Sequence, residues 1–459
     1  MSYLFSSDNK FVTWRKLWIA LAEAEQELGL SITDEQIEEL KTHRDNINYD
    51  VARKREKETR HDVMSHVFAY GEQCPKARGI IHLGATSAYV GDNTDIIVMT
   101  EALKLIKKKL VNLLEVLSKF AKTYKALPTL GFTHFQPAQL TTVGKRATLW
   151  LHDLLMDYEN IEIQLGKMKL RGAKGTTGTQ ASFMKLFDND SEKVKALDQK
   201  VAKKMGFDKT FPVTGQTYTR KVDFEVLSVL SGIAQSLHKM TNDLRLLQSL
   251  KEIEEPFEKD QIGSSAMAYK RNPMRSERIA SLARYVMSAV QNAAMTTSTQ
   301  WFERTLDDSA NRRITIPEMF MATDAIIEIA VNVSDGLVVY ENMIHQHIEK
   351  ELPFMATENI IMEAVKNGGD RQELHEKIRV HSMEAAKQVK IEGKENDLID
   401  RILKDEGFNL SENEISKIMN PMNFIGRAPQ QVVEFLEEYI DPILDKNKDL
   451  LGIEVDLKV

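Results

Sequence analysis

The residue types best suited to chemistry are concentrated between Gly263 and Arg278, where the sequence reads Gly-Ser-Ser-Ala-Met-Ala-Tyr-Lys-Arg-Asn-Pro-Met-Arg-Ser-Glu-Arg. A glycine and two hydroxyls give a flexible start, and a lysine, an arginine and an amide stand just before Pro273. Because proline is favoured at helix starts, we expect a long helix from Met274. A hinged loop with hydroxyls and cations suits closure over a small anion, whereas composition alone favours an ordinary surface loop that enters a helix.

Four further polar clusters lie at or near the ends of predicted helices. They are Arg60-His61-Asp62, residues 82–87, residues 131–137, and a segment after Trp301 that contains Arg304, Ser309, Asn311, Arg312 and Arg313. A capped helix end with surface charge accounts for any one of them. Arginines and helix N-termini both suit carboxylates and phosphates. The five clusters together therefore indicate an anionic substrate held where several loops converge.

Several other kinds of site lack support in the sequence. The chain has 11 histidines but a single cysteine, Cys74, and no His-Glu-x-x-His, so no metal site is expected. No Walker loop is present and no Gly-x-Gly-x-x-Gly follows a strand, which argues against nucleotide triphosphate hydrolysis and dinucleotide redox chemistry. The lysine run 107–109 is typical of a solvated helix face rather than of a nucleic-acid patch.

Composition and charge predict a soluble cytoplasmic protein. The net charge is −7, which gives no general attraction to nucleic acid or to an anionic membrane. The longest uncharged run, 285–302, is interrupted by Ser, Thr, Gln and Asn, so we do not expect it to span a membrane. No basic-apolar leader opens the chain, so secretion is not expected. One cysteine excludes an internal disulfide and fits a reducing compartment.

Hydrophobic periodicity predicts an all-α protein with a central bundle of long helices. The 459 residues include only 22 glycines and 11 prolines, which favours long helices over a turn-rich β architecture. In 221–251, apolar residues alternate steps of four and three, a heptad seam that must pack along another helix. Its members are Val226, Leu230, Ile233, Leu237, Met240, Leu244 and Leu247.

The remaining elements follow from the same patterns. We expect helices over 12–28, 33–42 (with a capping box between Thr33 and Gln36), 94–120, from 137 to about 170, 274–300 and 317–344. We expect a loop over 131–137 and irregular structure over 171–220. Shorter helices are expected over 358–367, 371–392, 396–404 and 429–444. These elements suggest an N-terminal helical domain (1–92), the long-helix bundle (93–344) and a C-terminal helical domain (345–459).

The run Gly-Ser-Ser-x-Met-x-x-Lys-x-Asn-Pro resembles the signature loop of the fumarase/aspartase superfamily, whose members eliminate fumarate from succinyl-bearing substrates. With Tyr269-Lys270-Arg271 and Ser276-Glu277-Arg278 added, the chain is most similar to the adenylosuccinate lyase family. The similarity covers nearly the whole chain, including residues 13–18, 351–359 and 426–431. It implies a fumarase/aspartase-like all-α fold.

The resemblance also implies roles for individual residues. Ser264 would be the general base and His134 the general acid, with Glu277 orienting the histidine. Serine is a poor base at its free pKa, so we expect Lys270 and the N-terminus of the following helix to stabilise its alkoxide. Lys270, Asn272, Thr86 and Ser87 would hold the succinyl carboxylates. The other substrate contacts would be Arg60, His61, Asp62, His82, Thr133, Gln216, Ser265, Arg278, Arg304, Ser309 and Arg313.

The family implies further properties of the whole enzyme. Its members are homotetramers that use no cofactor and build each site from loops of three subunits. They split adenylosuccinate to AMP, and SAICAR to AICAR, in purine synthesis. Two positions depart from the family pattern: Ala268 stands where proline is usual, and an Arg-Tyr pair expected ahead of residue 13 is absent after Met1. We expect KM to be higher than in a version extended at the N-terminus.

Two alternatives remain open at this point. One is another enzyme of the superfamily, such as an argininosuccinate lyase or a fumarase, against which Tyr269-Lys270-Arg271 and Ser276-Glu277-Arg278 argue. The other is a non-catalytic structural oligomer, against which the presence of both Ser264 and His134 speaks. The sequence also leaves open whether Ser264 or Ser265 takes the proton.

Overall fold

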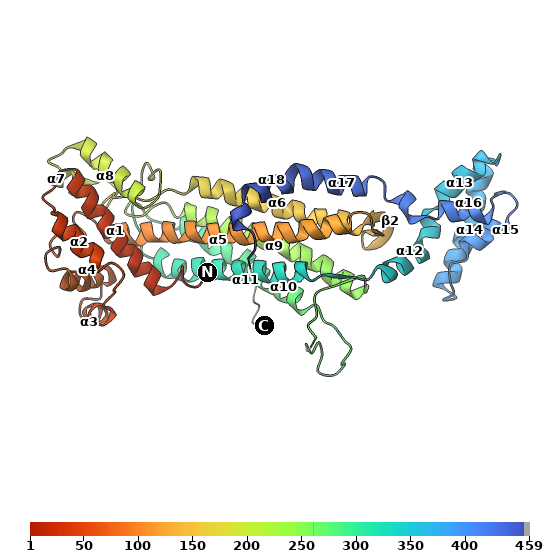
Figure 1. Cartoon of the computed structure of the whole chain (residues 1–459), viewed down its shortest axis with the longest axis horizontal. Helices are drawn as coiled ribbons and strands as arrows, with labels where there is room; N and C mark the ends of the chain where they lie inside the picture. Colours follow the sequence, from red (N-terminus) through yellow and green to blue (C-terminus); the bar gives the residue numbers. More distant parts are fainter. Residues whose placement is uncertain (260, 454–459) are drawn as a thin grey trace. The chain divides into compact units, whose positions relative to one another are not determined.

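Helices make up most of the chain, as the low glycine and proline content predicts. The computed structural model describes residues 1–259 and 261–453 (Figure 1). Within these residues the strands form only two small antiparallel sheets, β1 with β2 and β3 with β4. The prediction of an all-α fold is confirmed.

The elements run as follows. The long helices are α1 (Ser7–Glu27), α5 (Ser87–Thr123), α6 (Val143–Lys167), α9 (Lys221–Ser249), α10 (Met274–Ser298), α11 (Asp308–Asp335) and α14 (Arg371–Lys390). The shorter helices are α2 (Asp34–Thr42), α3 (Tyr49–Thr59), α4 (Asp62–Gln73), α7 (Ala181–Leu186), α8 (Ser191–Lys204), α12 (Glu341–Met355), α13 (Thr357–Lys366), α15 (Leu398–Lys404), α16 (Glu412–Ile418), α17 (Ala428–Phe435) and α18 (Asp441–Lys446). The strands are β1 (Pro128–Thr133), β2 (Gln136–Thr142), β3 (Ile253–Glu254) and β4 (Val338–Val339).

The chain divides into two compact units, and several long helices contribute to both. Unit 1 comprises residues 1–110, 157–237 and 281–327, and unit 2 comprises residues 111–156, 238–280 and 328–459. The three-domain division expected from the sequence stays a prediction.

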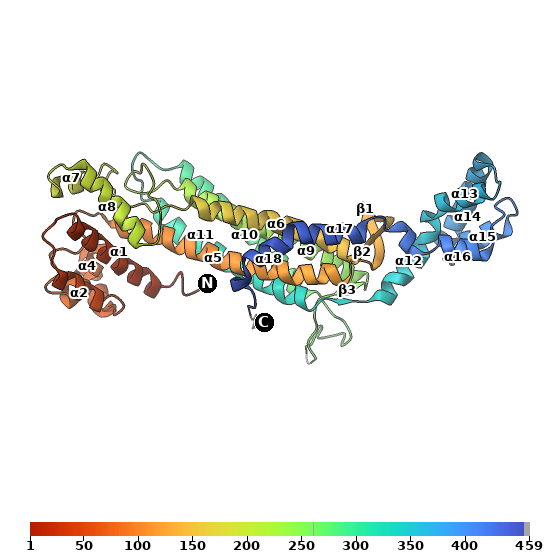
Figure 2. The same ribbon diagram turned by 45° about the horizontal axis from the view of Figure 1, so that its top comes forward.

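In unit 1, the first helices pack around a core of aromatic and branched side chains. Ser6 caps α1 by accepting a hydrogen bond from the amide of Asn9 at 3.2 Å. The predicted capping box of α2 is confirmed, because Thr33 and Gln36 each accept from the other's amide. Figure 2 shows α1 beside α2 and α8, and the cluster they share includes Trp14, Trp18, Ile37, Tyr70 and Leu197.

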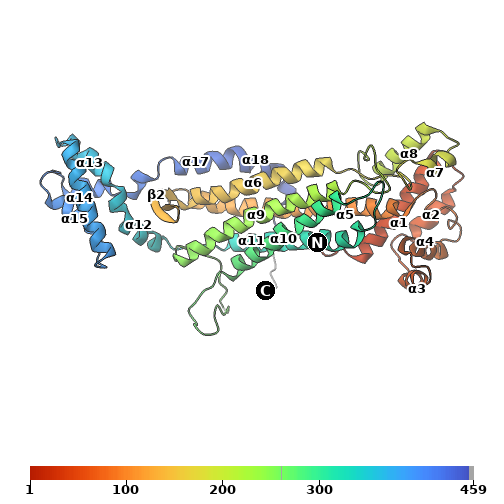
Figure 3. The ribbon, with the colours of Figure 1, turned by 180° about the vertical axis from the view of Figure 1, so that it is seen from behind.

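The long helices are joined by apolar packing and by buried charges. All seven residues of the α9 seam are at most 4% exposed, so the heptad prediction is confirmed. Lys109 of α5 pairs with Asp324 of α11, and Asp95 of α5 pairs with Arg312 of α11 at 2.9 Å. The helices α10 and α11 lie side by side (Figure 3). The side-chain amide of Asn311 on α11 donates to Asn292 on α10 at 2.9 Å.

Unit 2 contains both small sheets and the C-terminal helices. β3 leads out of α9 and pairs with β4, while β1 and β2 form a hairpin directly before α6. The helices α13 to α16 gather around their own core, with Ile360, Leu374, Ile402, Phe408 and Ile415 all at most 3% exposed (Figure 2).

Four expectations from the sequence were wrong in part. Residues 131–137 are not a loop, because they lie in the β1–β2 hairpin. The segment 171–220 is not irregular throughout, since it holds α7 and α8. The helix expected over 317–344 begins at Asp308 with Pro317 inside it and ends at Asp335. The segment 429–444 is not one α-helix, because a π-helical turn from Leu436 to Ile440 interrupts it.

Candidate active site

The signature loop holds the Ser264 hydroxyl against the backbone of the residues that follow it. The Oγ of Ser264 accepts hydrogen bonds from the amides of Ala266 at 3.3 Å and Met267 at 3.1 Å. Backbone N–H groups directed at an oxygen favour its anionic form. The loop projects away from β3 in Figure 2, and Ser265 and Lys270 are exposed on it.

Two contacts close this loop on itself. The side-chain amide of Asn272 donates to the carbonyl of Gly263 at 2.7 Å. A Cβ at Gly263 would lie 2.2 Å from the carbonyl oxygen of Lys270, so only glycine fits at this crossing. The residue that the sequence assigns to the substrate carboxylates, Asn272, therefore also holds the two ends of the loop together.

The N-terminus of α10 is already occupied by a carboxylate. Glu255, 6% exposed, accepts from the amides of Arg275 and Ser276 at 3.0 Å each, and from the Ser276 hydroxyl at 3.0 Å. The expectation that this helix end stabilises a serine alkoxide was wrong, because Glu255 takes up its N–H donors. Among the positive groups expected near the serine, Lys270 remains.

His134 stands at the tip of the β1–β2 hairpin. Thr133 pairs with Gln136, so His134 and Phe135 form a two-residue turn, and their φ angles are 53° and 58°. Positive φ at both positions is typical of a type I′ turn, in which non-glycine residues are strained. Thr133 and His134 are exposed. Among the described residues, no hydrogen bond or ion pair joins His134 to Glu277, which is exposed on the first turn of α10.

Arg60, His61 and Asp62 make the corner between α3 and α4. Arg60 has a φ of 55° at the end of α3, and His61 caps α4 because its Nδ1 accepts from the amide of Met64 at 3.2 Å. The ring therefore keeps its other nitrogen, Nε2, for a ligand. Arg60 and His61 are exposed.

His82 is a neutral imidazole fixed by a tryptophan. The Nε1–H of Trp18 donates to Nδ1 of His82 at 2.9 Å, and His82 has a φ of 67°. Burial, with a smaller contribution from the charge of His61, lowers the pKa of His82 to about 4. His82 can therefore donate from Nε2 near neutral pH but carries no positive charge there.

Lys10 lies near the candidate residues Asp62 and Arg313, although the sequence did not single it out. Burial lowers the pKa of Lys10, with Asp62 opposing the shift and Arg313 adding to it, so the three charges lie near one another. Its ammonium lies 4.9 Å from the Trp14 ring centroid. Lys10 is the fourth residue of α1 and lies ahead of the helix expected over 12–28, so it gives no sequence signal beyond its charge.

Thr86 and Ser87 stand at the N-terminus of α5. The Thr86 carbonyl accepts from the amide of Tyr89 at 2.8 Å, which starts the helix, and both side chains are partly exposed. This placement suits the carboxylate role that the sequence predicts for them.

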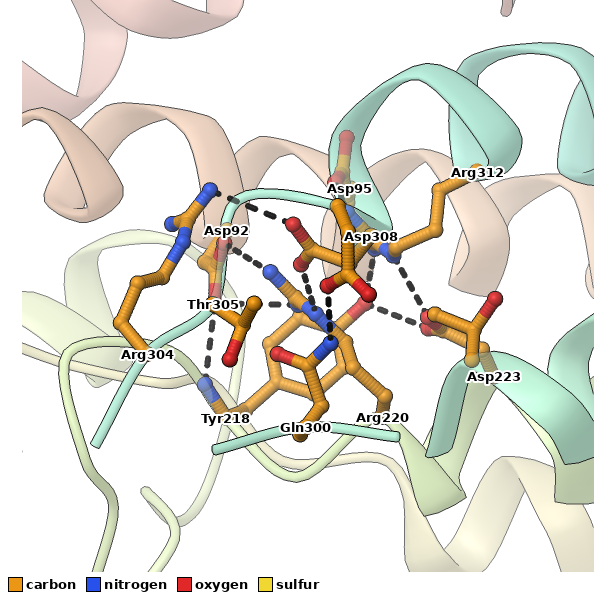
Figure 4. A network of polar contacts seen from close by, with 12 residues as sticks. Asp92, Asp95, Tyr218, Arg220, Asp223, Gln300, Arg304, Thr305, Asp308 and Arg312 are labelled. Carbon is orange, nitrogen blue, oxygen red and sulfur yellow. Dashed lines mark hydrogen bonds and ion pairs between the residues drawn. The ribbon is translucent and has the colours of Figure 1, made fainter. Parts of the chain in front are cut away.

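Gln216, Arg304 and Ser309 lie in two segments that are tied together. The Gln216 amide donates to the carbonyl of Glu303 at 3.0 Å, and its own carbonyl accepts from Arg171 at 2.8 Å. The side chain of Arg304 donates to Asp308 at 3.4 Å, as Figure 4 shows. Ser309 follows in the first turn of α11 and is partly exposed.

The candidate residues fall into two groups by unit. Unit 1 holds Arg60, His61, Asp62, His82, Thr86, Ser87, Gln216, Arg304, Ser309 and Arg313. Unit 2 holds Thr133, His134, Ser264, Ser265, Lys270, Asn272, Glu277 and Arg278. The proton-transfer candidates thus belong to one unit, and most cationic candidates for binding an anion belong to the other.

The described part of the chain shows neither a metal cluster nor a membrane-spanning helix. Among residues 1–259 and 261–453, no three His, Cys, Asp or Glu side chains are grouped to hold a metal ion. None of the helices in the same residues has the length and apolar character needed to cross a bilayer.

Comparison with known proteins decides the family. A family model described as "Lyase" matches residues 8–288, and one described as "Adenylosuccinate lyase C-terminus" matches residues 353–435. An adenylosuccinate lyase of Saccharomyces cerevisiae is 55% identical over 457 residues, which cover 99% of this chain and 95% of the relative. The chain belongs to the adenylosuccinate lyase family.

Other relatives agree with this assignment. An adenylosuccinate lyase of Schizosaccharomyces pombe is 53% identical and covers all of this chain and 96% of its own length. A fumarate lyase structure from Mesorhizobium sp. BNC1 shares the fold, with a TM-score of 0.80 at 20% identity over 95% of this chain and 97% of that one. The chain is a lyase with adenylosuccinate lyase activity, and the fold is fumarase-like.

Proposed function

We propose that the chain breaks the C–N bond of adenylosuccinate by acid–base elimination, with Ser264 as the base and His134 as the acid. Ser264 takes a proton from the succinyl methylene, and the C–H electron pair forms the new double bond. The electron pair of the C–N bond stays with the departing nitrogen, which takes a proton from His134. The products are AMP and fumarate, and the same chemistry extends to SAICAR.

The observation that best supports this mechanism is the hydrogen bonding of Ser264. Its Oγ receives two backbone amides, of Ala266 and Met267, which stabilise negative charge on the oxygen. This favours Ser264 over Ser265 as the base. We assign the stabilising positive charge to Lys270, six residues further along the same loop, because Glu255 occupies the N-terminus of α10.

The assignment of His134 as the acid is favoured by its fixed position on the β1–β2 hairpin. The hairpin pairing fixes the backbone on both sides of His134, and the tip carries two residues with positive φ. Such strain is typical of sites where function overrides local preference. Proton transfer by one positioned group is worth about 10²- to 10⁴-fold in rate.

The experiment that tests the acid is fumarate release from adenylosuccinate and from SAICAR by wild-type protein and by His134→Asn. We expect the variant to lose about 10²- to 10⁴-fold in kcat on both substrates, and to lose the limb of the pH–rate profile that reports the acid. His375→Asn, on an exposed turn of α14, is the control and should retain most activity. An unchanged pH profile and kcat in His134→Asn would contradict the assignment.

We also propose that the chain assembles into a homotetramer whose sites are shared between subunits. Leu149, Met156 and Ile163 of α6 are spaced seven residues apart and are each at least 50% exposed. On α10 and α11, Met295 and Ile314 are also more than half exposed. Apolar stripes of this kind on long helices suit association with other helices.

Association is tested by light scattering on Met156→Lys, with Lys203→Glu on the exposed face of α8 as the control. We expect the α6 variant to lower the mass and to lose activity, while the control remains a tetramer. A monomeric wild-type protein with full activity would contradict the shared sites.

We also propose a cytoplasmic location, which the single buried thiol of Cys74 supports. It is tested by fractionation of cells that produce the tagged chain.

A further inference from the structure

A buried network of charges connects three segments of unit 1. It joins the first turns of α5, the segment 216–223 at the start of α9, and the segment 300–312 that leads into α11 (Figure 4). These segments carry Gln216, Arg304 and Ser309, which are candidates for binding substrate.

Arg220 is the centre of one half of the network. Its side chain is 2% exposed, and its two Nη atoms donate to both oxygens of Asp92 at 3.2 and 3.1 Å. Its Nε donates to Oδ2 of Asp308 at 2.7 Å. Asp92 also accepts from the amide of Tyr218 at 2.9 Å, so Arg220 links α5, the segment before α9 and the start of α11.

Asp308 extends this link to Arg304. Asp308 is fully buried, and its second oxygen, Oδ1, accepts from Nη2 of Arg304 at 3.4 Å. The Nε of Arg304 is buried and has no hydrogen-bond partner among the described residues, although the side chain as a whole is 24% exposed. A buried donor without a partner is uncommon in folded proteins. Nη2 of the guanidinium is thus held by Asp308, while Nε is left unsatisfied among the described residues.

The other half of the network has the same chemistry but does not contact Arg304. Asp223 accepts from the Tyr218 hydroxyl and from Nε of Arg312, both at 2.6 Å, and Arg312 also pairs with Asp95. Asp308 and Asp223 are therefore comparable buried aspartates, each paired with a buried arginine. They differ because only Asp308 also accepts a hydrogen bond from Arg304, the candidate substrate contact.

We propose that Asp308, held in place by Arg220, is a positioning residue that orients the Arg304 guanidinium for binding the anionic substrate. The inference rests on the proposed role of Arg304 as a substrate contact. Asp308 restricts Arg304 to the orientation in which its remaining N–H groups face the ligand, which reduces the entropy lost on binding. A buried ion pair is weak grounds for a role in stability alone.

The test is a double-mutant cycle on KM for adenylosuccinate, with Asp308→Asn, Arg304→Gln and the double variant. We expect Arg304→Gln to raise KM about tenfold or more, as loss of a hydrogen bond to a charged group does. Asp308→Asn should raise KM several-fold with kcat nearly unchanged, because binding and not proton transfer is weakened. The double variant should be no worse than Arg304→Gln alone.

Asp223→Asn is the matched control. It removes the same charge from the same network, so a purely structural role predicts similar losses of Tm for both variants. Asp223→Asn should change KM by the same factor whether residue 304 is arginine or glutamine. Asp308→Glu keeps the charge and should restore part of the lost affinity.

The outcomes separate this inference from the assignment it rests on. If Arg304→Gln leaves KM unchanged, both the substrate contact and the inference fall. If Arg304→Gln raises KM, and the double variant raises KM by the product of the two single effects, the positioning role alone is overturned. Should Asp308→Asn not fold, Arg304→Lys takes its place. Lysine cannot donate to Asp308 and substrate from a planar fork, so KM should rise about tenfold, and an unchanged KM would overturn the inference.

Discussion

Glu255 accepts hydrogen bonds from both the amide and the hydroxyl of Ser276, at 3.0 Å each, across the base of the signature loop. Its other oxygen accepts from the amide of Arg275. Glu255, which directly follows β3, thus caps the helix α10 that follows the loop. This clasp ties together the two ends of the connection between β3 and α10.

Replacing Glu255 with glutamine should destabilise the protein by about 1–3 kcal/mol, because a buried charge-assisted cap is lost. The measurement is the Tm of the variant by calorimetry. Glu258→Gln is the control, since Glu258 pairs with Arg275 but its side chain is 73% exposed. An exposed pair contributes about 0–1 kcal/mol. Equal Tm values for the two variants would show that Glu255 is not the cap described here.

Gly263→Ala should reduce kcat by tenfold or more without unfolding the protein. The added Cβ would lie 2.2 Å from the carbonyl oxygen of Lys270, so the crossing that places Ser264 must open. The loss is measured as fumarate release at saturating substrate. Gly79→Ala, where a Cβ meets nothing within 4 Å, should keep wild-type activity. Full activity in Gly263→Ala would mean that this crossing is unimportant in the closed loop.

Stability should fall as the pH drops from about 6.5 to about 4, because His66 and His82 are held neutral. Burial lowers the pKa of each to about 4, from 6.5 in the unfolded chain. In this window the unfolded chain binds protons that the folded chain does not, so lower pH favours unfolding.

The buried residue His66 gives the clearer test. His66 is 6% exposed and stacks on Phe11 at 3.7 Å between ring centroids. His66→Phe should reduce the slope of unfolding free energy against pH by up to about 1.4 kcal/mol per unit. Met383→Gln, which changes an exposed and non-titrating side chain of α14, should leave the slope as it is. An unchanged slope in His66→Phe would contradict the account.

Local and periodic signals were sufficient to predict part of the fold. The capping box of Thr33 and Gln36 depends on residues three apart, and the α9 seam on a repeat of seven, so both are visible without tertiary information. The hairpin was missed because His134 and Phe135 are not residues that favour its turn, and strand pairing overrides their preference. The helix expected from residue 317 begins nine residues earlier, at Asp308, and Pro317 lies inside it.

The sequence proposes site residues where a linear motif carries them, and it does not reveal the contacts between distant residues that hold some of them in place. Ser264 and Lys270 stand in one recognisable run, but nothing in the sequence near Glu255 or Asp308 indicates that one caps α10 and the other holds Arg304. α8 was also missed, although Asp190 as its cap and buried Val194, Leu197 and Val201 give a helical pattern in retrospect. Glycine- and threonine-rich flanks hid that pattern.

The most direct test of the central claim is the rate of fumarate release by Ser264→Ala and Ser265→Ala, measured side by side with wild-type protein at saturating adenylosuccinate. Both substitutions remove one hydroxyl from the same loop, but only the Ser264 oxygen accepts the amides of Ala266 and Met267. We predict that Ser264→Ala loses about 10²- to 10⁴-fold in kcat with its fold and assembly intact, and that Ser265→Ala loses far less. The reverse order, or an active Ser264→Ala, would contradict the assignment of the base.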